Sequence, residues 1–79
     1  MENYIYKTAV QNALKQLRLD AQITQLQLAD LIKKPQSFIS KYENGEREID
    51  FITVYLVCCA LNKKLSDFQE LLESFLSST

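Results

Sequence analysis

The chain has 79 residues, enough for one small domain, and its 47% hydrophobic and 24% charged residues are typical of a folded protein. It contains no histidine, which excludes Ser-His-Asp triads and histidine-bearing zinc sites. Its single glycine excludes glycine-rich phosphate loops, and Cys58 and Cys59 are adjacent, so neither a CxxC motif nor a disulfide framework is available. We expect one domain over residues 1–79, structural cysteines, and no enzyme activity, cofactor or metal.

The net charge of −1 does not by itself predict a nucleic-acid partner, but the charges are unevenly distributed. Up to Arg47 there are seven basic and five acidic residues, and from Glu48 onward there are two basic and five acidic ones. An anionic partner should therefore meet the first part of the chain. No secretory signal is visible, and the longest apolar run, Phe51–Leu61, is far shorter than the roughly 20 residues of a membrane span. We expect a cytoplasmic protein with no membrane partner.

Helical periodicity dominates the sequence and predicts an all-α fold. A first helix is expected over about Tyr4–Asp20, where apolar residues recur at spacings of three and four. Thr24 and Gln27 have the spacing of a capping box, which predicts that a second helix begins there.

A short turn, Lys33-Lys34-Pro35, separates the second helix from a third over Gln36–Glu43. Proline disfavours helical dihedrals in the residue before it and suits the start of a new helix. The third helix should end at Asn44-Gly45, because glycine tolerates the left-handed conformation found just past helix ends.

Two further helices complete the expected set of five. Asp50 is a candidate N-cap for a fourth helix over Phe51–Leu61. Ser66 and Gln69 have the spacing of another capping box, which predicts a C-terminal helix over 66–77.

The second and third helices, joined by so short a turn, predict a helix-turn-helix. Its second helix must be polar on its outer face to enter the major groove and apolar on its inner face to be held rigidly. Phe38 or Ile39, together with Tyr42, would supply the inner face. The outer face would consist of Gln36, Ser37, Ser40 and Lys41. Glutamine can bond adenine and lysine can reach guanine acceptors, although a solvated helix face with no partner fits these residues as well.

Four segments give the chain a family likeness: LKQLR (14–18), ITQLQLADLI (23–32), SFISKYENGER (37–47), and LVCCAL leading to LSDF, which ends at residue 68. Over about 55 of the 79 residues they resemble, in register and without gaps, the XRE family of phage-repressor and Cro-type helix-turn-helix domains. The resemblance implies a compact, five-helix, lambda repressor-like domain with residues 1–13 as an extension. It also implies binding of double-stranded DNA and regulation of transcription, for example as a repressor, in a prokaryotic or phage setting at the nucleoid.

The resemblance further implies roles for individual residues. The positions that read bases are Gln36, Ser37 and Lys41, with Ser40 nearby. The positions that contact phosphates are Gln25, Asn44 and Arg47. Arg18 and Glu43 match a pair that ties the first helix to the end of the third. For Lys33 and Lys34, contact with phosphate and a purely solubilising role are equally good interpretations. Lys33 also departs from the family pattern, because the family often has glycine at this position of the turn.

The fourth helix has more apolar residues than one inward face needs. We expect its core positions to be Phe51, Val54, Tyr55, Cys58 and Leu61. Ile52, Leu56 and Cys59 would then point outward, and Leu72, Phe75 and Leu76 are similarly in excess on the C-terminal helix. These residues predict a homodimer that reads a palindromic operator. The alternative is that the N-terminal extension and the C-terminal tail cover the fourth helix on all sides.

The rival function is a protein-interaction module, such as an antitoxin-like protein, that uses the same fold without reading bases. The net acidity favours it slightly, and the polar face that begins at Gln36 disfavours it. A protein partner is therefore possible beside DNA.

Overall fold

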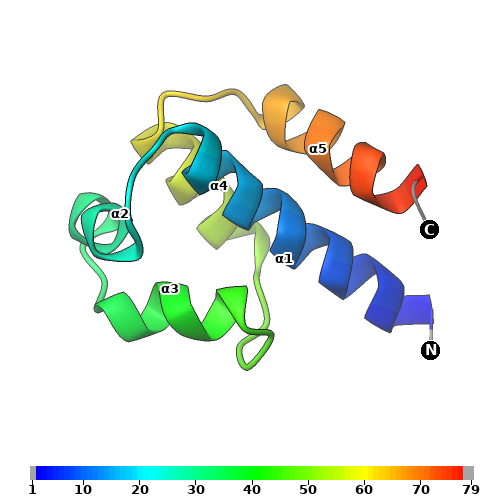
Figure 1. Cartoon of the computed structure of the whole chain (residues 1–79), viewed down its shortest axis with the longest axis horizontal. Coiled ribbons are helices and arrows are strands. Elements are labelled where there is room, and N and C mark those ends of the chain that lie inside the picture. Colours follow the sequence, from blue (N-terminus) through cyan, green and yellow to red (C-terminus); the bar gives the residue numbers. More distant parts are fainter. Residues whose placement is uncertain (1, 78–79) are drawn as a thin grey trace.

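The computed structural model describes residues 2–77, and these residues form five helices and no strand, as expected (Figure 1). The helices are α1 (Glu2–Asp20), α2 (Gln25–Ile32), α3 (Gln36–Glu43), α4 (Phe51–Ala60) and α5 (Leu65–Ser77). The all-α, helix-turn-helix architecture is confirmed. Within the same residues, no helix is long and apolar enough to cross a membrane.

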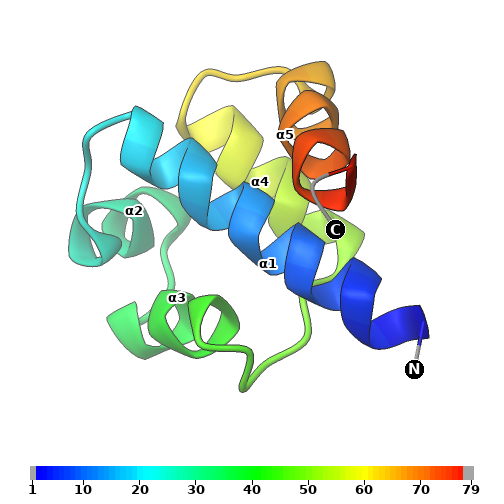
Figure 2. The same cartoon turned by 45° about the vertical axis from the view of Figure 1, so that its right-hand side comes forward.

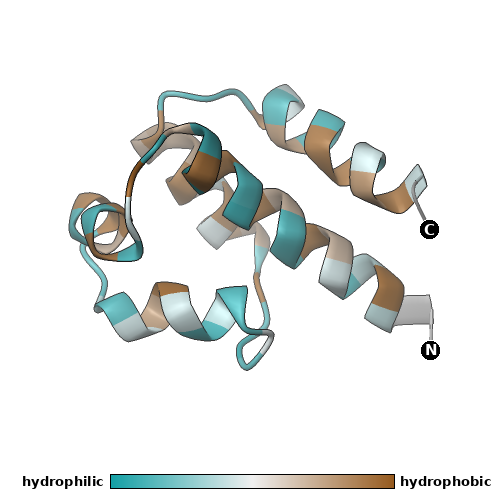
Figure 3. Ribbon diagram, in the orientation of Figure 1, coloured by the Kyte–Doolittle hydropathy of each residue, from teal (hydrophilic) through white to brown (hydrophobic). Residues whose placement is uncertain are grey.

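The long helix α1 is the centre of the arrangement (Figures 1 and 2). Helix α5 runs along one side of α1, so that the start of α1 and the end of α5 lie at the same end of the molecule. Helices α2 and α3 pack against each other, and α4 contacts α2, α1 and α5. Figure 3 shows the hydrophobic side of α5 turned toward α1.

The core fills the space between all five helices. It is formed by Ala13, Leu14, Leu17, Leu28, Ala29, Ile32, Ile39, Tyr42, Val54, Val57, Cys58 and Phe68. Burying this much apolar side chain is the main stabilising contribution available to so small a domain. Since members of α2 and α3 are among the most buried, the helix-turn-helix is fixed to the rest of the molecule.

Two of the three expected helix caps are present. Thr24 and Gln27 form the capping box, with Thr24 Oγ1 accepting from the Gln27 amide at 3.0 Å. Asp50 Oδ1 accepts from the amide of Thr53 at 2.8 Å and caps α4.

The cap of α5 was predicted wrongly. The helix begins at Leu65, before Ser66, and the carboxylate of Asp67 accepts a hydrogen bond from the Lys64 amide at 2.8 Å. A carboxylate in the first turn also interacts favourably with the helix dipole, which a serine hydroxyl cannot do. Asp67 therefore sets the start of the helix, and Ser66 lies within its first turn.

The inward face of α4 was predicted only in part. Val54 and Cys58 are buried, as expected, but Phe51 and Tyr55 are 67% and 53% exposed. Their expected places in the core are taken by Thr53 and Val57, both buried. Because α4 is apolar on every side, its periodicity could not indicate which side faces the core.

Candidate nucleic-acid interface

The turn between α2 and α3 is tight and left-handed. Lys33 adopts φ 59° and ψ 47°, and the next amide, of Lys34, donates to the Ala29 carbonyl at 3.0 Å. This conformation costs a side-chain-bearing residue about 1 kcal/mol relative to glycine. Pro35 then takes an extended conformation and is the N-cap residue of α3.

Helix α3 has one buried and one exposed side. Ile39 and Tyr42 are 0% and 1% exposed and fix the inner side to the core. Gln36, Ser37 and Lys41 are exposed on the outer side, and Ser40 is half-buried there. The outer side presents amide, hydroxyl and ammonium groups, which are the groups that can hydrogen-bond base edges.

A buried ion pair fixes the C-terminal end of α3. Arg18 donates from Nε and Nη2 to the two carboxylate oxygens of Glu43, at 2.7 and 2.9 Å, and from Nη1 to the Ile23 carbonyl at 2.9 Å. This bidentate pair raises the pKa of Arg18, chiefly through the hydrogen bond to Glu43 and against the opposing effect of burial. It joins α1 to α3, as the family resemblance implies.

Gln25, expected to contact phosphate, has a second role in this network. Its side chain is half-buried and its Nε2 donates to Glu43 Oε1 at 2.9 Å. One of its two amide protons is therefore already used inside the protein. A phosphate could be met only by the remaining proton or by backbone amides at the start of α2.

The four other expected phosphate contacts lie at the two ends of α3 and are all exposed: Lys33, Lys34, Asn44 and Arg47. Two of them, Lys34 and Arg47, lie over one aromatic ring. Lys34 Nζ lies 5.3 Å and Arg47 Cζ 4.6 Å from the ring centre of Phe38, within the range of a cation–π contact. Phe38 meets Tyr42 edge-on at 6.0 Å.

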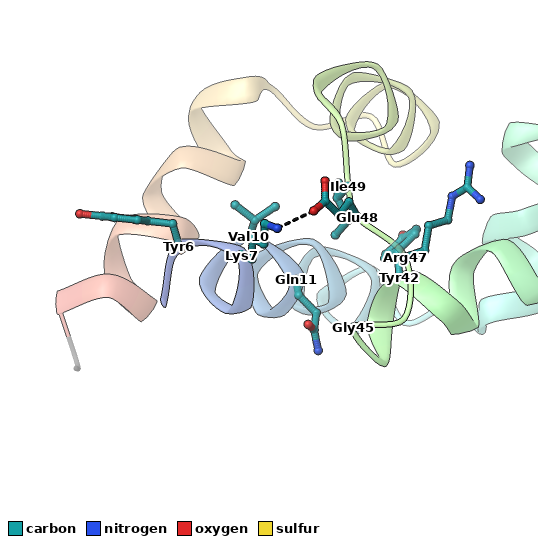
Figure 4. Close-up of a pocket in the computed structure, with 9 residues that line it drawn as sticks. All are labelled: Tyr6, Lys7, Val10, Gln11, Tyr42, Gly45, Arg47, Glu48 and Ile49. Carbon is teal, nitrogen blue, oxygen red and sulfur yellow. Dashed lines mark hydrogen bonds and ion pairs between the residues drawn. The ribbon is translucent and has the colours of Figure 1, made fainter. Parts of the chain in front are cut away.

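The loop between α3 and α4 is tied to the N-terminal half of α1 (Figure 4). Gln11 Nε2 donates to the Glu43 carbonyl at 2.7 Å, and Lys7 forms an ion pair with Glu48. Gly45 has φ +81°, and a Cβ there would lie 3.1 Å from Gln11 Oε1. The positive φ therefore favours glycine in the loop, and any side chain there would also displace the end of Gln11 slightly.

A cavity of about 320 Å³ lies between α1 and this loop, lined in part by Tyr6, Val10 and Ile49 (Figure 4). Tyr42 also lines it, and its hydroxyl is the one buried side-chain polar atom without a partner in the described part of the chain. Burial raises the pKa of Tyr42, and the nearby charge of Glu43 adds to this, so the phenol stays neutral. Across residues 2–77, no group of three acidic or cysteine side chains could hold a metal ion.

Helix α4 presents an apolar surface on the side away from the core. We call Phe51, Ile52, Tyr55, Leu56 and Cys59 the α4 apolar face. All five are exposed, Leu56 by 38% and Phe51 and Ile52 by 67% each. The neighbouring Cys58 is buried, which raises the pKa of its thiol.

The three expected interface residues of α5 are less accessible than those of α4. Leu72, Phe75 and Leu76 are half-buried, and the first two pack against the core.

The comparisons with known proteins agree with this geometry. A helix-turn-helix family model matches residues 14–68. An XRE-family like protein from Pseudomonas syringae pv. tomato is 36% identical, with a TM-score of 0.77, and the alignment covers 92% of this chain and 88% of that one. The clp gene regulator ClgR from C. glutamicum is 24% identical with a TM-score of 0.79, covering 90% and 91% of the two chains, and so shares the fold. No curated protein sequence matches significantly. The chain belongs to the XRE family of helix-turn-helix DNA-binding transcription regulators.

Proposed function

We propose that the chain binds a specific double-stranded DNA operator as a homodimer, with α3 in the major groove. The observation that carries this proposal is the division of α3: Ile39 and Tyr42 are fully buried while Gln36, Ser37 and Lys41 are exposed on the other side. A recognition helix has to be held rigidly from behind and to present polar groups in front. Ser40, being half-buried, makes at most a supporting contact.

The phosphate contacts in this proposal are Lys33, Lys34, Asn44 and Arg47, because they are exposed at the ends of α3. Contacts of this kind fix the register of the protein on the duplex without carrying sequence information. Gln25 serves mainly to support Glu43, since one amide proton is used there.

The homodimer would form through the α4 apolar face. Helix α4 contains no charged residue, and its five exposed apolar side chains follow one another along one side of the helix. A contiguous apolar patch of this kind marks a protein interface, and a two-fold axis would bring two copies of the same patch together. Leu72, Phe75 and Leu76 would lie at its border, because each is already half-covered within its own subunit.

Protein binding without base reading is the second candidate, and two observations favour it. The chain has a net charge of −1, which weakens non-specific attraction to DNA, and the α4 apolar face could take a different protein as well as a second copy.

Selection from a random duplex library, at stated salt, separates the two candidates. We expect an inverted repeat with half-site centres about 10 base pairs apart, equal to one helical turn or about 34 Å. If the folded chain enriches no sequence, base reading is refuted and the protein-binding candidate is favoured. A single half-site without symmetry would retain base reading and refute the two-fold dimer.

A further inference from the structure

Phe38 occupies an unusual place on the recognition helix. Its ring is only half-buried, and the ring centre lies 5.3 Å from Lys34 Nζ and 4.6 Å from Arg47 Cζ. Lys34 belongs to the turn before α3 and Arg47 to the loop after it. One side chain therefore contacts a cation from each end of the recognition helix.

The ring itself is held in a fixed place. It meets the ring of Tyr42 at an interplanar angle of 87°, and Tyr42 is 1% exposed in the core. Edge-to-face contacts of this kind have a preferred geometry. A continuous chain of contacts thus runs from the core through Tyr42 and Phe38 to two exposed cations.

Holding these cations in place before DNA arrives has a clear energetic effect. Long basic side chains lose rotamer freedom when they bind a phosphate, and this loss reduces affinity. A guanidinium placed above an aromatic ring has already lost part of that freedom, while the N–H groups at its edge stay available to an anion. The electrostatic attraction of the ring for each cation adds to this effect.

We propose that Phe38 is a positioning residue that holds Lys34 and Arg47 ready for the phosphates on either side of the major groove. This role rests on the proposed function, because it requires α3 to enter the groove. Phe38 touches no base in this role, so its effect is the same on every DNA sequence.

The test compares Phe38→Leu with the ring-preserving Phe38→Tyr in the full chain. We expect Phe38→Leu to weaken binding to the selected operator and to an unrelated duplex by the same factor, about 3- to 10-fold for one or two ordered side chains. Phe38→Tyr should stay within about twofold of the wild type, because the ring face remains. A loss confined to the operator would overturn the proposal.

A double-variant cycle distinguishes positioning from a merely structural role. In an Arg47→Ala background, Phe38→Leu should cause a smaller loss than in the wild type, because only Lys34 remains to be held. If the chain binds DNA but Phe38→Leu lowers affinity equally in the wild type and in the Arg47→Ala background, the positioning role is refuted and the proposed function is not. A wild-type chain that binds no duplex would refute the proposed function and this role together.

A measurement on the unmodified protein covers the case in which Phe38→Leu does not fold. Protons above an aromatic ring are shielded, so the side-chain proton resonances of Arg47 should be shifted upfield in the NMR spectrum of the free protein. Ordinary positions for these resonances would overturn the proposal without any variant.

Discussion

Glu43→Ala should be among the most destabilising single changes in this domain. The Glu43 carboxylate accepts two hydrogen bonds from Arg18, at 2.7 and 2.9 Å, and one from Gln25 at 2.9 Å. Arg18 and Glu43 are only 8% and 4% exposed. Removing the carboxylate takes both Glu43 hydrogen bonds from the buried guanidinium of Arg18 and leaves it the one to the Ile23 carbonyl.

Breaking a buried pair in this way costs about 3–5 kcal/mol. A domain of this length has a total unfolding free energy of about 4–12 kcal/mol, so the loss is about a quarter of the total or more. At about 4–8 °C per kcal/mol, the Tm should fall by about 12 °C or more. Urea unfolding of the wild type and variant at equal concentration measures the difference. Glu46→Ala, an exposed acid in the following loop, is the matched control and should change little. A Glu43→Ala loss of about 1 kcal/mol or less would show that solvent already reaches the pair.

Three further predictions concern the operator, the dimer and acid stability. Lys41→Ala should reduce the free energy of binding to the operator by about 1–3 kcal/mol, and change binding to unrelated duplexes little, in a gel shift at fixed salt. An equal loss on all sequences would make Lys41 a phosphate contact. Leu56→Glu should give monomers in sedimentation and weaken operator binding. The control Leu31→Glu, at a leucine on α2 that is 56% exposed against 38% for Leu56, should leave the dimer intact; a dimeric Leu56→Glu would refute the proposed interface. The Thr53 amide holds the pKa of Asp50 below its usual range, so the stabilisation by this cap is complete above about pH 4 and is lost as the pH falls through the lowered pKa. Asp50→Asn keeps the capping oxygen without the titration, so its unfolding free energy should depend less on pH in that range.

Much of the helical arrangement could be predicted from local signals. The Thr24–Gln27 capping box and Asp50 fixed the starts of α2 and α4, because the hydrogen bonds of a cap involve residues three positions apart. Two such signals overlap at the start of α5: the Ser66–Gln69 spacing and the carboxylate of Asp67. Spacing alone does not indicate which of the two caps the helix.

The α4 apolar face shows where periodicity stops being informative. Every exposed side of α4 is apolar, so the sequence contains no polar stripe to identify the solvent side. The choice between Tyr55 outside and Val57 inside depends on the positions of α2, α1 and α5, which contact α4 in the fold.

Some contacts of the candidate interface could not be predicted from the sequence, because they join residues that share no local motif. Either Phe38 or Ile39 was expected on the inner face, and the apolar character of Phe38 gave no sign that Arg47 would lie over its ring. Lys7 and Glu48 are 41 positions apart and share no motif. The Arg18–Glu43 pair was expected only through the family resemblance, since two opposite charges 25 positions apart have no local signature.

We expect the buried pair to contribute more to the orientation of α3 than to net stability, and a double variant can separate the two effects. Replacing Arg18 and Glu43 together by Met and Leu removes both buried charges, and such replacements are often neutral or stabilising. We therefore expect the double variant to recover most of the unfolding free energy that Glu43→Ala loses. Its operator affinity should nevertheless be lower than that of the wild type, because no bidentate contact then fixes the angle between α1 and α3, and Gln25 has lost its partner. Recovery of both stability and affinity would mean that core packing alone around Ile39 and Tyr42 is enough to aim the recognition helix.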